Sequence, residues 1–79
     1  YPNPFNPVTY IEFAIPKSSM VKLTIYNVQG RVVETIVNSE LSAGNYKADW
    51  NAANYSSGVY YYKLEAEGNV AAKKMLLIK

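Results

Sequence analysis

Apolar and polar residues alternate along most of this chain, and this period of two restricts its fold more than any other feature. Every second residue is apolar in two early segments, and these rows are Ile11, Phe13, Ile15 and Val21, Leu23, Ile25. Successive side chains of a β-strand point to opposite faces, so each row gives its strand one buried face. No segment combines the three-to-four spacing of an amphipathic helix with helix caps. The pattern therefore predicts an all-β protein.

Turn signals at short intervals divide the chain into about six to seven short strands. Asn27 opens and Gly30 closes a four-residue turn, which predicts a hairpin between the flanking strands. Residues 67–69 predict a second tight connection, before a last strand from Val70 to Ile78. Together with the alternation, these signals predict a small Ig-like Greek-key β-sandwich that forms one domain over residues 1–79.

Two segments, residues 41–46 and 55–60, place an apolar residue, a glycine and a tyrosine at identical spacing. Each segment opens a predicted strand, with Gly44 before Tyr46 in the first and Gly58 before Tyr60 in the second. Glycine permits the backbone to turn, and the tyrosine ring packs while its hydroxyl bonds back to the turn, as in the tyrosine corner of Ig-like sandwiches. We expect such a corner at both places.

The start of the chain is rich in proline, because residues 1–8 hold three of the four prolines. Proline donates no backbone hydrogen bond and keeps the chain extended, so this segment cannot lie in the centre of a sheet. We expect an arm that docks on the sandwich through Pro4, Phe5 and Pro7. The alternative is a stiff spacer with one stray aromatic side chain.

The composition lacks residue types that commonly act in catalysis. The chain has no histidine and no cysteine, so it lacks the usual proton shuttle, the usual base for a serine nucleophile and any disulfide. A chain of this length buries only roughly 60% of its surface on folding, which leaves little room for a cleft. We therefore expect no enzyme activity and no cofactor.

Two groups of acidic and amide side chains are the strongest candidates for a chemical site. Glu65 and Glu67 lie two residues apart, a spacing that glycosidase carboxylates can use, but they flank a hairpin turn and not a cleft. Asp49, Asn51 and Asn54 offer oxygen atoms to calcium, but the glycine and closing glutamate of a calcium loop are absent. Surface and turn roles explain both groups better, so we expect no metal site.

Charge and hydropathy restrict the kinds of partner. Eight basic residues against six acidic ones give a net charge of +2, and the basic residues are scattered except near the chain end. Nucleic-acid binding needs a basic stripe, so we expect no nucleic acid. No apolar run approaches the ~20 residues of a membrane-spanning helix, and no leader-like segment opens the chain. We expect a folded module without a membrane span.

The last seven residues are the strongest candidate for a binding site, and they are Lys73, Lys74, Met75, Leu76, Leu77, Ile78 and Lys79. Four consecutive apolar residues do not fit a strand with one buried face. Either both faces are covered, or one face awaits a partner. The flanking lysines are typical of an aggregation-prone strand that is guarded by charge. The other explanation is a strand that merely completes the core.

Four motifs, in this order and spacing, resemble a known family. They are YPNPFNP at residues 1–7, VKLTIYNVQGRVV at residues 21–33, SGVY at residues 57–60 and KKMLLIK at residues 73–79. Over essentially the whole chain they resemble the type A C-terminal sorting domain of the type IX (Por) secretion system. The pattern is also similar to the Ig-like domain of flagellar hook-cap proteins, and the lysine-rich last strand favours the sorting domain.

The resemblance implies a non-enzymatic sorting signal at the end of a larger exported cargo protein. In that family an outer-membrane translocon recognises the folded domain, and a sortase-like protease often removes it. The implied location is the periplasm in transit and then the cell surface or the extracellular space. Carried onto this sequence, the recognition element is residues 73–79, supported by Gly58 and Tyr60 in the preceding turn.

Two other kinds of function stay open at this point. The first is a carbohydrate-binding or spacer module of a cell-surface glycosidase. It is suggested by eight tyrosines and one tryptophan, with Tyr10, Tyr26 and Tyr61 expected on the surface. The second is a self-assembling fibre subunit, because unpaired strand edges invite pairing between copies of a chain.

Overall fold

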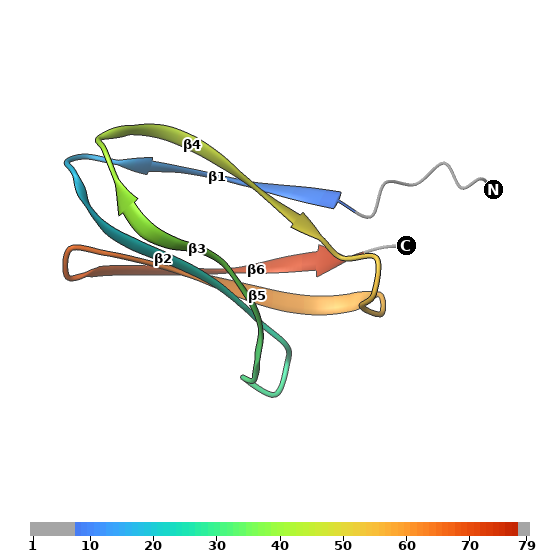
Figure 1. Ribbon diagram of the computed structural model, residues 1–79. Helices are drawn as coiled ribbons and strands as arrows, with labels where there is room; N and C mark the ends of the chain where they lie inside the picture. The colour runs from blue at the N-terminus through green and yellow to red at the C-terminus, as the bar shows by residue number, and fades with distance from the viewer. Residues whose placement is uncertain (1–7, 78–79) are drawn as a thin grey trace.

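The computed structural model describes residues 8–77, which form six strands in two antiparallel sheets (Figure 1). The strands are β1 (Val8–Ile15), β2 (Ser19–Tyr26), β3 (Val32–Leu41), β4 (Gly44–Asn51), β5 (Gly58–Ala66) and β6 (Asn69–Leu77). β1 pairs with β4, and the other four strands form a sheet in the order β3-β2-β5-β6. Within this part of the chain, no helix has the length and hydropathy needed to cross a membrane. The predicted all-β sandwich is confirmed.

The strand order is that of a Greek key. β2–β3 and β5–β6 are hairpins, and they join into one sheet because β2 pairs with β5. β1 and β4 form the other layer, from the pair Val8 and Asn51 to the pair Ile15 and Gly44. This is the arrangement of Ig-like sandwiches. Of the predicted arm, Val8 begins β1, whereas Pro4, Phe5 and Pro7 lie outside the described residues.

The core lies between the two sheets and is built from the alternating rows. Val21, Leu23 and Ile25 of β2 have no exposed surface. Trp50 of β4 packs edge-on against Tyr60 of β5, with 5.1 Å between the ring centroids. Such aromatic contacts bury large apolar areas, which a small sandwich without disulfides needs.

The predicted turns are also present. The side-chain Oδ1 of Asn27 accepts hydrogen bonds from the backbone N–H groups of Gln29 (2.9 Å) and Arg31 (3.1 Å), and Gly30 has a φ of 81°. Asparagine thus fixes the start of the turn and glycine supplies the left-handed backbone at its end. The predicted hairpin between β2 and β3 is confirmed.

Both predicted tyrosine corners form. The hydroxyl of Tyr46 donates to the carbonyl of Ser42 at 2.6 Å, and the hydroxyl of Tyr60 donates to the carbonyl of Ser56 at 2.8 Å. Each tyrosine follows a glycine with a φ near 150°, a conformation that side chains disfavour. The corners therefore fix where β4 and β5 begin.

Candidate functional site: the edge strand β6

β6 lies at the end of the four-stranded sheet. Among residues 8–77 its pairing partner is β5, from the pair Gly58 and Leu77 to the pair Ala66 and Asn69. The opposite side of β6 therefore presents backbone N–H and C=O groups that no described strand occupies. Such an edge is a template for pairing with another chain.

The apolar run of β6 is divided between two faces. Directly opposed residues of paired strands share a face, and Met75 and Leu77 lie opposite Tyr60 and Gly58 on the core side. Leu77 is 7% exposed, whereas Leu76, on the outer face, is 65% exposed. Two explanations were open for this run: that both faces are covered, or that one face awaits a partner. The described residues support the second, because the inner face is covered and the outer face is open.

The two lysines at the start of the run also point to different faces. Lys73 lies opposite Tyr62, which packs against the core, so Lys73 is on the inner face. Lys74 lies opposite Tyr61 on the outer face. Both lysines are exposed, and neither forms an ion pair with another described residue. Ile78 and Lys79 lie outside the described residues.

The predicted supporting turn lies directly against the predicted recognition strand. Gly58 pairs with Leu77, and Tyr60 pairs with Met75. Tyr60 is buried, and its ring contacts both Trp50 and Tyr55. Gly58 and Tyr60 therefore support the end of β6 by pairing with it from β5. The buried Tyr60 side chain is not available for contact with a partner.

An apolar band crosses the outer face of the sheet and reaches β6. Its members share that face, because Tyr26 lies opposite both Val32 and Tyr61, and Tyr61 lies opposite Lys74. Tyr61 and Val32 are exposed, as is Leu76. The exposure of Tyr61 follows from its alternation with buried neighbours, but the place of Val32 in this band depends on the register between strands and was not predicted.

The charged groups beside this band are paired on β5 and unpaired on β6. The Nζ atom of Lys63 lies 3.2 Å from Oε2 of Glu65 and 5.4 Å from the centroid of the Tyr26 ring. Hydrogen bonding to Tyr26, followed by the effect of Glu65, raises the pKa of Lys63 above its ordinary value. The positive charge of Lys63 is therefore compensated by Glu65, whereas Lys73 and Lys74 have no ion-pair partner among the described residues.

The weaker candidates for a chemical site have structural roles. Glu65 is in the ion pair with Lys63, and Glu67 occupies the β5–β6 turn. The side-chain Oδ1 of Asn51 accepts a hydrogen bond from the backbone N–H of Ala53 at 3.1 Å, as expected for a turn. No group of three potential metal-ligating side chains occurs in residues 8–77.

Residues 1–79, the whole chain, match the family model of the secretion system C-terminal sorting domain. The chain belongs to the type IX sorting-domain family. No curated protein and no solved structure is similar enough to this chain to count as a match.

Membership indicates that this sorting domain is a C-terminal signal for type IX secretion. It implies interaction with the secretion machinery, attachment to a cargo protein, and export to the cell surface or the extracellular space. The family consists of sorting signals and is not known as catalytic. The carbohydrate-binding, spacer and fibre alternatives receive no support.

Proposed function

We propose that β6 is the recognition strand of this sorting domain and that the outer-membrane translocon reads it while the domain is folded. The observation that carries the proposal is the position of β6 at a sheet edge with an exposed outer face. An edge strand can pair with a receptor through its backbone, and unpaired lysines speed encounter with an acidic surface.

Some residues of β6 anchor the strand to the core, and others contact the partner. Met75 and Leu77 fasten the strand to the core, supported from β5 by Gly58 and Tyr60. The partner contacts the exposed Leu76 and the two lysines, and the run continues through Ile78 and Lys79. Recognition therefore depends on the folded sandwich, because folding determines which side chains face outwards.

The rest of the proposed route concerns the whole precursor. Residues 1–7, with Pro4, Phe5 and Pro7, join the sandwich to its cargo as a docked arm. The domain passes through the periplasm before it meets the translocon. A sortase-like protease then cuts upstream of the arm, which leaves the cargo at the cell surface or releases it.

A reporter with a signal peptide, fused to residues 1–79 in a host with a type IX system, tests the role of β6. Deleting residues 75–79 is a poor test, because it also removes Met75 and Leu77 from the core. The sharper variant is Lys74→Glu combined with Leu76→Ser, which alters only exposed outer-face side chains. We expect surface delivery to fall to the level of a fusion without the sorting domain.

The matched control is Val28→Ser, which removes an equally exposed apolar side chain from the β2–β3 turn. It should leave delivery unchanged. Thermal unfolding of each purified domain establishes that the variants are folded. Normal delivery of the folded Lys74→Glu, Leu76→Ser variant would contradict the recognition role of β6.

A further inference from the structure

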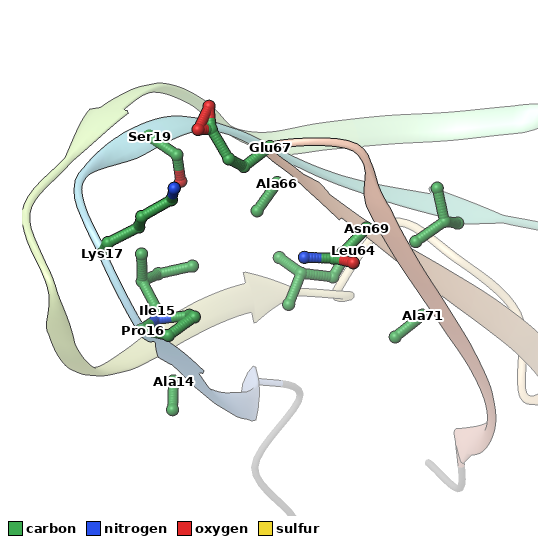
Figure 2. A pocket seen from close by; sticks show the side chains of 11 residues that line it. Ala14, Ile15, Pro16, Lys17, Ser19, Leu64, Ala66, Glu67, Asn69 and Ala71 are labelled. Carbon is green, nitrogen blue, oxygen red and sulfur yellow. The ribbon is translucent and has the colours of Figure 1, made fainter.

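A cavity of about 230 Å³ opens between the two sheets at the start of β6 (Figure 2). Ala14 and Ile15, at the end of β1, line one side, and Leu64 of β5 and Ala71 of β6 line the other. β1 and β6 are end strands of their sheets, and Pro16 and Lys17 of the β1–β2 connection complete the lining between them. The cavity is therefore part of an open seam between two strand edges.

The register of β6 determines which added side chains enter this seam. Ala71 and Lys73 lie opposite Leu64 and Tyr62, so both are on the inner face. In a strand added to the free edge of β6, the residue opposite Ala71 also points inwards, into the cavity. The residue two positions away points inwards as well, towards Lys73. The small side chain of Ala71 leaves room for a larger apolar neighbour.

Lys73 restricts what such a strand contains. An inward-facing lysine on an edge strand is a device that prevents indiscriminate pairing between edges. A purely apolar strand would bury its ammonium group without a partner, which is costly, whereas a carboxylate in register compensates the charge. No described acidic residue pairs with Lys73. The lysine therefore selects for an acidic strand.

This chain does not itself supply that strand. Residues 1–7, which precede β1, contain no aspartate or glutamate. A second copy of β6 in the seam would bring lysines against lysines. Glu67, the one acidic residue of the cavity lining, belongs to the β5–β6 turn. Residues 1–79 therefore do not supply the matching carboxylate.

We propose that the seam beside β6 binds an extended acidic segment of a partner protein, which adds a strand to the free edge of β6. The segment carries an apolar side chain that fills the cavity and, two residues away, a carboxylate that pairs with Lys73. This inference rests on the proposed function, because it specifies the chemistry of the partner that reads β6.

Selection of displayed random ten-residue peptides on the immobilised 79-residue protein tests the inference. We expect enrichment of peptides with an apolar and an acidic residue two positions apart. Lys73→Glu should exchange the acidic preference for a basic one, and Lys73→Gln should abolish it. Ala71→Leu should fill the cavity and remove the preference for a large apolar residue.

Exposed positions on the outer face of the same sheet supply the controls. Lys22→Glu on β2 and Ala72→Leu on β6 make the same changes there and should keep both preferences. For one selected peptide, measured by fluorescence anisotropy, Lys73→Glu should weaken binding by about tenfold or more, which corresponds to about 1.4 kcal/mol. All four positions are exposed, and circular dichroism checks that the variants fold.

The outcomes separate this inference from the proposed function. No enrichment, or preferences that survive both Lys73→Glu and Ala71→Leu, would overturn strand addition at the seam. If strand addition is overturned in this way but the Lys74→Glu, Leu76→Ser fusion still fails to be exported, β6 keeps its recognition role and binds its partner by another kind of contact. If the peptides behave as expected but that fusion is exported normally, the seam binds acidic strands and the sorting role of β6 is wrong.

Discussion

Glu67 has the least favourable backbone conformation for its residue type in residues 8–77, where it is the one non-glycine residue with a positive φ. Its φ of 51° and the φ of 81° at Gly68 form the two-residue loop of a type I′ hairpin. Asparagine and glycine tolerate this left-handed region, whereas other side chains lose about 1 kcal/mol or more there.

We therefore expect Glu67→Asn to raise the free energy of unfolding by about 1 kcal/mol. Urea denaturation of the two proteins measures it. The control is Glu40→Asn, the same substitution at an exposed position of β3, where the backbone is extended and no gain is expected. An equal gain at both positions would show that the backbone at Glu67 is not the cause.

The repeated tyrosine corners allow one hydrogen bond to be compared in two environments. Tyr60→Phe removes a bond from a part-buried hydroxyl, and Tyr46→Phe removes one from an exposed hydroxyl. A buried carbonyl left without its donor costs more than one that water can reach. We expect a loss of about 1 kcal/mol for Tyr60→Phe and a smaller loss for Tyr46→Phe, measured by thermal unfolding. The reverse order would mean that the Tyr46 corner is the more important one for folding.

At the scale of elements, the division of β6 between two faces makes a testable distinction between adjacent leucines. Leu77→Ala should destabilise the protein by about 2–4 kcal/mol, because Leu77 is part of the core cluster. Leu76→Ala should change stability by no more than about 0.5 kcal/mol, because Leu76 is exposed. Chemical denaturation distinguishes the two, and similar losses would contradict the assigned faces.

The sequence predicts the elements well where the signals are local. Alternation identifies the buried row of β2, and the Asn27 turn and the tyrosine corners depend on residues within a few positions of each other. The run at residues 75–78 has no such signal, because four apolar residues have no period. The division of this run between the inner and outer faces follows from the pairing of β6 with β5. The edge position of β6 follows from the order of four strands, and both are long-range properties.

At the scale of the whole molecule, the two edges of the larger sheet are protected in different ways. β3 has two register shifts against β2, at Leu23/Thr24 and Ile25/Tyr26, and such irregularities twist an edge away from regular pairing. β6 pairs with β5 without a shift, so its protection depends on side chains, above all on the inward-facing Lys73. This explains how a chain with an open edge can avoid the self-assembly that the sequence left open.

Replacing Lys73 should therefore change the association state of the molecule. Lys73→Val makes the inner face of β6 apolar from Ala71 to Leu77, and we expect this variant to form dimers or larger species through β6, with a sedimentation coefficient that rises with concentration. The control is Lys22→Val, which adds the same apolar surface to the central strand β2, where both edges are already paired. It should sediment as the unmodified protein does. If the sedimentation coefficient of Lys73→Val also did not change with concentration, Lys73 would not be the residue that prevents pairing at this edge. The inferred selection of acidic strands depends on the same lysine and would then lose its physical basis.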